Sequence, residues 1–320
     1  MGHVAKDLLL GVAVGDALGV PYEFWSRERM ALEPATEMTG HGTHRQLPGT
    51  WSDDSSLTFC LAEALAKGYG LVHCAENFIK WRNESYWTAR GSIFDIGMTT
   101  ASAISDIQTI LEQKRFRDLR LLKYQAEEYD NGNGSLMRIL PLVFELKGLK
   151  PKAQFELVWD NSSLTHRHIR AAMACTIYLN FAELVIEGLP KKQAYSKTQR
   201  KIMDLWEEME FAERERKHFA RVIQNDISKV DEHGILSGGY VIESLEASMW
   251  CIMNTSNYAE AVLKAVNLGH DTDTTAAIIG GLAGLIFGSD SIPAPWVEQL
   301  ARLEDILDLA GRLERRYTLR

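Results

Sequence analysis

The chain has few cysteines. Only four occur among its 320 residues, and none belongs to a Cys-x-x-Cys pair or to another spacing typical of a metal site. Cys60, Cys74, Cys175 and Cys251 each lie in or beside an apolar segment with helical spacing. This pattern predicts reduced, mostly buried thiols in a cytoplasmic protein.

Positive charge is also scarce. Lysine and arginine together number 35 against 43 aspartates and glutamates, which gives a formal net charge of −8. Non-specific binding to nucleic acids depends on clustered basic side chains, so this composition disfavours it.

Long apolar runs are missing as well. The longest, Ala276 to Gly288, is shorter than the ~20 residues that span a bilayer. The apolar N-terminal stretch is interrupted by Gly15-Asp16, and Asp7 stands where a signal peptide carries positive charge. We therefore expect a soluble, cytoplasmic, monomeric protein with no membrane partner.

Strand-like alternation is hard to find, whereas helical periodicity is widespread. The clearest helical patterns cover residues 55–68, 171–188, 240–254 and 296–317. Residues 191–232 are charge-dense and predict exposed helices. Because neither a linker nor a repeat divides the chain, the sequence predicts a single all-α domain over residues 1–320.

Glycine recurs with helical spacing in two segments. Gly11, Gly15 and Gly19 form one series, and Gly280, Gly284 and Gly288 form the other. Each series removes side chains from one helix face and allows another backbone to approach closely. Acidic residues near these faces are then drawn into a crowded interior, where an uncompensated charge is costly.

Two short acidic clusters precede apolar segments. One is Ser52-Asp53-Asp54, and the other contains Asp271, Asp273 and Thr274. Taken singly, each is typical of helix capping, with acids in the first turn. Together, their carboxylate and hydroxyl oxygens have the hardness that Mg²⁺ or Mn²⁺ prefers, and they are numerous enough to hold two such ions.

Seven motifs in order carry a family resemblance: "GVAVGDALGVPYEF", "WSDDSSLTF", "FDIGMTT", "NGNGSLMRILPL", "LTHRHIRA", "GGYVIESLEASMW" and "GHDTDTTAAIIGGLAG". Together they resemble the ADP-ribosylglycohydrolase family, including the enzyme that reactivates dinitrogenase reductase. The resemblance runs from Leu8 to about Gly288. It implies an all-α fold with a binuclear Mg²⁺ or Mn²⁺ centre and an ADP-ribosylated protein or small ADP-ribosyl compound as substrate.

The resemblance also implies site residues. The expected metal shell is Ser52, Asp53, Asp54, Asp271, Asp273 and Thr274, with Ser52 in place of the usual threonine. The expected catalytic acids are Glu23 and Asp95. The expected substrate contacts are Asn131, Gly132, Asn133, Gly134, Ser135, His166, Tyr240 and His270, the last standing where many members have Gly or Asp.

Several neighbouring residues have more ordinary expectations. Arg138 and Glu246 are expected to make internal ion pairs or hydrogen bonds, and Met98 and Met137 to pack in the core. His168 is expected on the surface.

The implied reaction is water attack at C1″ of the distal ribose, which releases ADP-ribose from an acceptor, with arginine favoured. Ions bound at the ribose hydroxyls position C1″, and Glu23 or Asp95 serves as general base. Two alternatives remain open. One is an ADP-ribose-binding module without turnover, and the other is an HD-type metal phosphohydrolase, suggested by the pair His270-Asp271.

Overall fold

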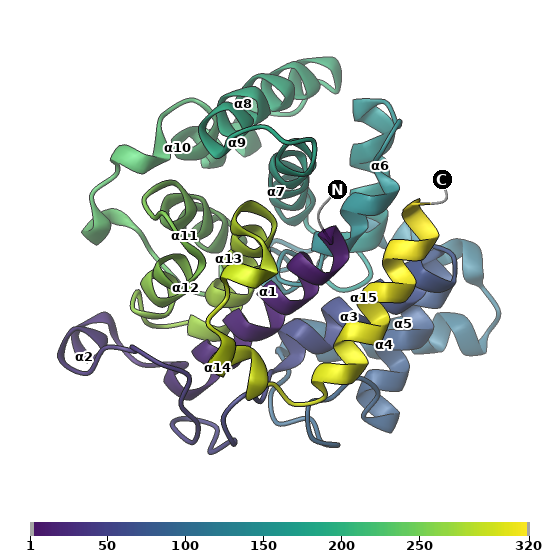
Figure 1. Cartoon of the computed structure of the whole chain (residues 1–320). Helices are drawn as coiled ribbons and strands as arrows, with labels where there is room; N and C mark the ends of the chain where they lie inside the picture. Colours follow the sequence, from purple (N-terminus) through teal and green to yellow (C-terminus); the bar gives the residue numbers. More distant parts are fainter. Residues whose placement is uncertain (1–2, 319–320) are drawn as a thin grey trace.

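Two helices from opposite ends of the chain form the axis of the fold. In the computed structural model, which describes residues 3–318, α1 (Val4–Gly19) and α13 (Thr272–Phe287) make the most extensive helix–helix contact. They lie side by side at the centre of the molecule (Figure 1). No β-strand occurs in the described range, only two isolated bridges, so the all-α prediction is confirmed.

Glycines explain how closely these two helices approach. A Cβ added at Gly11 would lie 2.3 Å from the carbonyl oxygen of Gly280, and one at Gly15 would lie 2.1 Å from that of Ala276. Gly284 meets the backbone of Asp7 in the same way, at 2.1 Å. Gly288 does not belong to this face: it ends α13 with a positive φ of 81° and has no neighbour within 4 Å.

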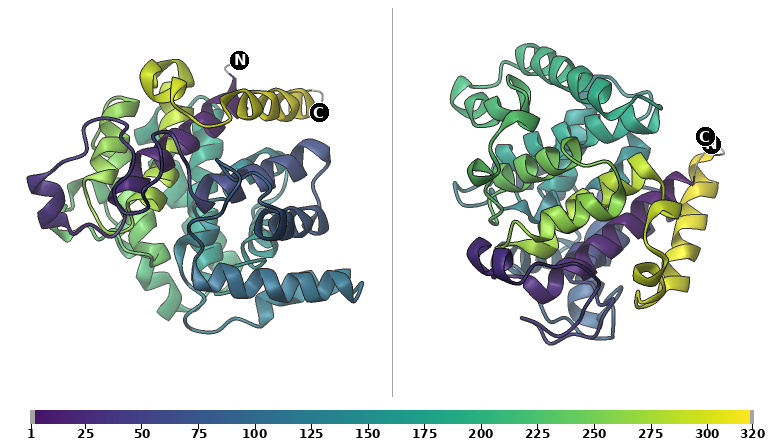
Figure 2. Two further views of the ribbon diagram at one scale, coloured as in Figure 1. Left: turned by 90° about the horizontal axis from the view of Figure 1, so that it is seen from below. Right: turned by 60° about the vertical axis from the view of Figure 1, so that its left-hand side comes forward.

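The remaining helices surround this pair in two groups (Figures 1 and 2). On one side lie α3 (Asp53–Lys67), α4 (Leu71–Glu84), α5 (Met98–Glu112) and α15 (Leu303–Thr318). On the other side lie α6 (Pro151–Ser162), α7 (Ile169–Ile186), α8 (Lys191–Glu208), α11 (Val241–Met253) and α12 (Tyr258–Val266). The short helices are α2 (Arg27–Leu32), α9 (Glu213–Arg216), α10 (Ala220–Ile223) and α14 (Ala294–Glu298).

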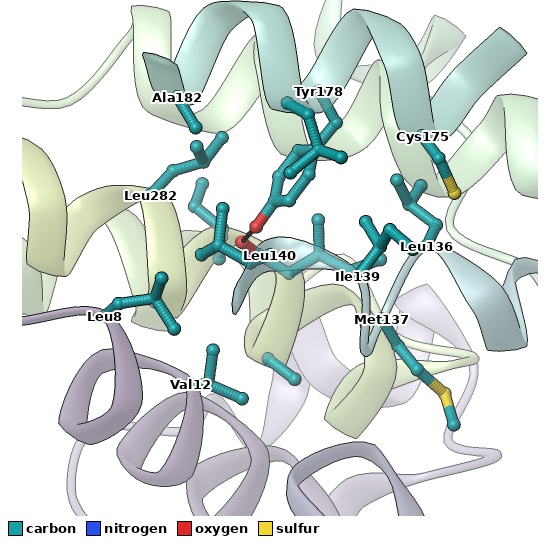
Figure 3. Packing of buried hydrophobic residues seen from close by; sticks show 14 of the residues in the cluster. Leu8, Val12, Leu136, Met137, Ile139, Leu140, Cys175, Tyr178, Ala182 and Leu282 are labelled. Atoms are coloured by element: carbon teal, nitrogen blue, oxygen red, sulfur yellow. Dashed lines mark hydrogen bonds between the residues drawn. The ribbon is translucent and has the colours of Figure 1, made fainter. Parts of the chain in front are cut away.

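One apolar core joins the two groups. Leu8 and Val12 of α1 and Leu282 of α13 face Leu140 and Tyr178 across it (Figure 3). The buried Tyr178 hydroxyl donates to the carbonyl of Ile278 at 2.7 Å, which satisfies the polar end of its ring. All four cysteines are buried and free, as the sequence predicts.

Helix α7 is the one segment of the described chain that is long and apolar enough to cross a membrane. It instead packs against α6, α8, α11 and α13, and 72% of its apolar window is buried inside the molecule. Its uniform apolarity is what a helix surrounded by others requires.

Three sequence expectations are wrong in detail. The stretch 296–317 is not one helix: α14 and α15 are separated at Arg302, which has a φ of 51°, because the chain there docks on the loop at Gly49, whose carbonyl accepts from the Ala301 N–H at 2.9 Å. Met98 is 90% exposed rather than in the core, because it begins α5 on the outer surface. His168 is buried rather than exposed, and its Nδ1 caps α7 by accepting from the Arg170 N–H at 3.2 Å.

Candidate functional site

The N-terminal ends of α3 and α13 bring the two acidic clusters together. Oxygen atoms of Asp16, Asp54 and Asp273 lie within 4.8 Å of one another, and so do those of Glu23, Asp271 and Asp273. The two groups of carboxylates share Asp273. Residues far apart in the chain thus form one site in which a single carboxylate belongs to two adjacent ligand sets.

Asp16 holds the start of α3 in place. Its fully buried carboxylate accepts from the N–H groups of Ser52 and Ser55, both at 2.9 Å, and from the Ser55 hydroxyl at 2.6 Å. An anion here accepts from N–H groups that the first turn of a helix leaves free, and its charge interacts favourably with the positive end of the helix dipole. Burial raises the pKa of Asp16 to about 6, although these hydrogen bonds favour the charged form.

Asp54 has an unused ligand atom. Its Oδ2 accepts from the Ser52 hydroxyl at 2.8 Å and lies 3.4 Å from the Thr274 hydroxyl, but its buried Oδ1 has no hydrogen-bond partner. Burial, followed by the charges of Asp16, Asp53 and Asp271, raises its pKa well above the usual range. A buried, unpaired oxygen among carboxylates is suited to a cation.

Asp271 and Asp273 differ in whether they bond to the free N–H groups at the start of α13. Asp271 occupies the N-cap position of α13 but makes no side-chain cap, and its Oδ2 instead accepts from the Asn133 amide at 2.7 Å. Asp273 Oδ1 accepts from the N–H of Thr274 at 2.9 Å. The capping interpretation therefore holds for Ser52, whose hydroxyl accepts from the Asp54 N–H at 3.3 Å, and fails for Asp271.

Asp53 and Asp95 face a common small hollow. It has a volume of about 10 Å³, and its lining also includes Ser52, Phe94 and Trp51. This is roughly the space that one water molecule needs. Burial, followed by the charges of Asp95, Asp16, Glu23 and Asp271, raises the pKa of Asp53 well above its usual value. Asp53 is thus beside the two carboxylate groups but not a member of either.

Glu23 is held by a histidine that sequence reasoning did not single out. His44 Nε2 is hydrogen-bonded to Glu23 Oε2, and both side chains are largely buried. Burial raises the pKa of Glu23, with Asp95 adding to the effect and His44 opposing it. The hydrogen bond to Glu23 raises the pKa of His44.

The loop 131–135 is anchored at one end of the site. The N–H of Asn133 donates to the Gly239 carbonyl at 3.0 Å, and its amide bridges Asp271 and the hydroxyl of Ser244, 2.8 Å away. Gly132 and Gly134 leave room for the ring of His166: a Cβ at Gly134 would lie 2.5 Å from its Cε1. Burial lowers the pKa of His166 to about 3, so its ring is neutral and supports the loop by packing.

The other residues predicted to contact the substrate differ in how deeply they are buried. Ser135 is fully buried and accepts from the hydroxyl of Ser162 at 2.8 Å, so its side chain points into the interior. Tyr240 is half-buried at the N-cap of α11 and pairs with Gly132 through a β-bridge. His270 is exposed, with a positive φ of 62°. Their contacts with a substrate stay predictions.

Two internal residues behave as expected. The buried Arg138 guanidinium donates to Asn161 Oδ1 at 2.8 Å and to the Thr165 hydroxyl at 2.9 Å. Glu246 pairs with Arg221 at 2.9 Å. Neither side chain enters the acidic site.

Two residues of the candidate site, Asp16 and His44, were not among the predicted site residues, although Asp16 was expected in the crowded interior. Asp16 had one signal, since an acid between Gly15 and Gly19 on a crowded helix face must be paired with something specific. His44 had none, because its partner Glu23 is 21 positions away in an irregular segment.

The donor set fits hard divalent cations. Among the described residues, both groups that could hold a metal consist of carboxylates and contain no histidine. Shared carboxylates, an unpaired Asp54 oxygen and mutually raised pKa values are the conditions that bound Mg²⁺ or Mn²⁺ would relieve. The histidine-containing ligand set of an HD-type phosphohydrolase is not assembled in this part of the chain.

Comparison with known proteins gives one consistent result. The family model described as ADP-ribosylglycohydrolase matches residues 4–320. The chain is 33% identical to the ADP-ribosylarginine hydrolase Tri1 of Serratia proteamaculans (strain 568), over 97% of this chain and 78% of the relative. It is 27% identical to the ADP-ribosyl-[dinitrogen reductase] glycohydrolase of Rhodospirillum rubrum, over 92% and 90%.

A solved structure has the same fold. It is titled "ADP-ribosylglycohydrolase-related protein complex" and superposes with a TM-score of 0.77 at 27% identity, covering 98% of both chains. The match extends over the helical body described above as well as over the acidic site.

Proposed function

The chain belongs to the ADP-ribosylglycohydrolase family, and we propose that it removes ADP-ribose from modified arginine side chains of proteins, using two divalent cations. The arginine acceptor is supported by relatives at 33% and 30% identity that are named ADP-ribosylarginine hydrolases. The observation that carries the metal requirement is the pair of carboxylate triads that share Asp273.

The ligands proposed for the ions are the carboxylates of Asp53, Asp54, Asp271 and Asp273, with the hydroxyl groups of Ser52 and Thr274 beside them. Asp16 and Glu23 border this set, but they are hydrogen-bonded to Ser55 and His44 and have supporting roles. When bound, Mg²⁺ or Mn²⁺ would supply Lewis acidity and a fixed attachment point for the ribose hydroxyls. The protein supplies the rest: Asp16 fixes the start of α3, and Asn133 orients Asp271. These contacts hold the donor atoms in place before a substrate arrives.

We assign the water-activating role to Asp95. Asp95 and Asp53 line the same hollow, which has room for about one water molecule. The water oxygen bonds to C1″ while the bond from C1″ to the guanidinium nitrogen breaks. The carboxylate takes the water's proton, and this proton ends on the departing guanidine, which is a strong base and leaves as guanidinium. Glu23, held by His44, is the alternative base.

The decisive experiment measures ADP-ribose release from an arginine-linked substrate with Mg²⁺, Mn²⁺ or EDTA. Asp53→Asn and Asp271→Asn should each abolish metal-dependent release while the protein remains folded by circular dichroism. Asp290→Asn, at an exposed position, is the matched control. Full activity in either site variant would overturn the metal-centre assignment.

The same assay separates the remaining functions. A panel of arginine-, serine- and small-molecule-linked ADP-ribose identifies the acceptor. Tight, metal-dependent binding of ADP-ribose without turnover of any linkage would instead support a binding module.

A further inference from the structure

Three aromatic rings form a row beside Glu23. The ring centroids of Phe24 and His44 are 6.1 Å apart, and those of His44 and Phe94 are 5.2 Å apart. The row connects the two carboxylates discussed above: Phe24 follows Glu23 in the chain, Phe94 precedes Asp95, and His44 is bonded to Glu23. We call Phe24, His44 and Phe94 the ring row.

Phe24 is held in a conformation that costs free energy. It has a φ of 67°, where bulky residues are outliers, and its side chain is 69% exposed. Its N–H donates to the carbonyl of His270 at 2.7 Å, and the N–H of His270 donates to the carbonyl of Trp25 at 2.6 Å. These two bonds join residues 24 and 25 to His270, so two residues with positive φ are held together, one next to Glu23 and the other next to Asp271 in the chain.

A glycine next to His270 provides a contrast with Phe24, because it combines a positive φ with close backbone neighbours. Gly269 also has a positive φ, of 78°, and a Cβ there would lie 2.8 Å from the Trp25 carbonyl. Glycine is present where a side chain cannot fit, whereas a large aromatic residue is present at position 24. Strained, exposed residues beside a site point to a role for the side chain.

The electrostatic surroundings of the row favour a cation. Its two phenylalanines are next in the chain to the acids Glu23 and Asp95, and Glu23 belongs to a group of three carboxylates with Asp271 and Asp273. The His44 ring is hydrogen-bonded to Glu23, so a positive charge on this ring would be paired with a carboxylate. Aromatic faces flanked by carboxylates attract planar, weakly hydrated cations, and guanidinium is the side-chain group of this kind.

We propose that the ring row is the acceptor subsite, in which Phe24 and Phe94 contact the guanidinium of the modified arginine. His44 fixes the positions of Phe24 and Glu23. This inference rests on the proposed function and adds to it the part of the site that distinguishes a cationic, N-linked acceptor from a neutral, O-linked one. An O-linked serine offers the row neither a planar group nor a charge.

The test replaces the Phe24 side chain with one that can adopt the same positive φ. Asparagine tolerates a positive φ, so Phe24→Asn removes the ring and keeps the turn, whereas Phe24→Tyr keeps the ring. The control is Lys114→Asn, because Lys114 is another exposed non-glycine residue with a φ of 57° but lies beyond the end of α5. The measurements are kcat/KM for arginine-linked and serine-linked substrates, the Kd of free ADP-ribose, and Tm.

We expect Phe24→Asn to lower the preference for the arginine-linked substrate about tenfold. Phe24→Tyr should restore the preference, and Lys114→Asn should leave it unchanged. The affinity for ADP-ribose should change less than twofold, because the product has no acceptor, and Tm should hold or rise. An unchanged preference, or a parallel loss of ADP-ribose affinity, would overturn the assignment.

A probe independent of turnover separates this inference from the proposed function. Agmatine, a free guanidinium compound, should show ligand-observed NMR saturation transfer with the wild-type protein and a weaker signal with Phe24→Asn. If the wild type cleaves no linkage, the proposed hydrolase fails, and loss of the agmatine signal in Phe24→Asn still supports a guanidinium subsite. Equal agmatine signals in both proteins would contradict the subsite.

Discussion

The hydroxyl of Ser55 donates to the carboxylate of Asp16 at 2.6 Å, although the two residues lie 39 positions apart. This bond, with the two N–H groups beside it, ties the C-terminal part of α1 to the N-terminus of α3. It therefore sets the position of Ser52 and Asp54, and with them one side of the proposed metal centre.

We predict that Asp16→Asn weakens activation by Mg²⁺. An amide has a single acceptor oxygen and no charge, so it cannot satisfy the same donors at the start of α3. Loss of such a supporting contact costs roughly 10–100-fold in metal affinity or activity. The activation constant for Mg²⁺ measures the effect, and Asp7→Asn, on the same helix but bonded to the Ser289 N–H, serves as control. Equal constants for Asp16→Asn and wild type would contradict this role.

Gly15→Ala should destabilise the protein and also impair the site. The new Cβ would lie 2.1 Å from the Ala276 carbonyl, so α1 and α13 must separate. Overpacking of this kind costs about 2–3 kcal/mol of unfolding free energy, and it shifts the helix that carries Asp273. Denaturant unfolding and ADP-ribose release test the two effects. Gly311→Ala, near only the flexible Arg315 side chain, should instead be neutral or stabilising.

Protonation of His166 should destabilise the protein in acid. Burial lowers its folded-state pKa to about 3, below the unfolded value of 6.5, so its contribution is complete above pH 6.5 and is lost as pH falls toward 3. The expected loss is about 1.4 kcal/mol per pH unit in that window. The wild-type curve of unfolding free energy against pH, measured with EDTA, should be steeper in this sense than that of His166→Gln. Parallel curves would refute the prediction, and His73→Gln is the exposed control.

Asn133→Asp should damage the site without unfolding the protein. The Asn133 amide donates to Asp271 Oδ2 at 2.7 Å, and a carboxylate there would repel Asp271 instead. Removing a charge-assisted hydrogen bond and adding this repulsion predicts a roughly 10–100-fold lower kcat/KM. Asn225→Asp, in an exposed turn, is the matched control. An active Asn133→Asp enzyme would show that Asp271 needs no such orientation.

The helices could be predicted from the sequence because the spacing of apolar residues within each segment indicates them. The helical spacing of Gly11, Gly15 and Gly280 likewise predicts the close contact between α1 and α13. The break between α14 and α15 could not be predicted from local spacing, because it depends on a tertiary hydrogen bond between Ala301 and Gly49. Local pattern is a reliable guide where a helix makes its own bonds and a poor one where distant backbone interrupts it.

The candidate site follows the same division. Ser52, Asp53, Asp54, Asp271 and Asp273 were found through motifs that recur in the family. Pairings across the fold were not: His44 meets Glu23, and Asp16 meets Ser55, only after the chain has folded. Such supporting residues carry no local signature, since any polar side chain in the right place has an ordinary sequence context.

The shared carboxylate of Asp273 also sets an order for synthesis. One triad joins Asp273 to Asp16 and Asp54, which are translated about 220 or more residues earlier. At roughly 5–20 residues per second, the early acids are made about 10–50 s before their partner. During that interval α1 also lacks the helix against which its glycines pack. Before α13 is translated, the growing chain therefore cannot form this arrangement of carboxylates, and the proposed metal-dependent catalysis cannot begin.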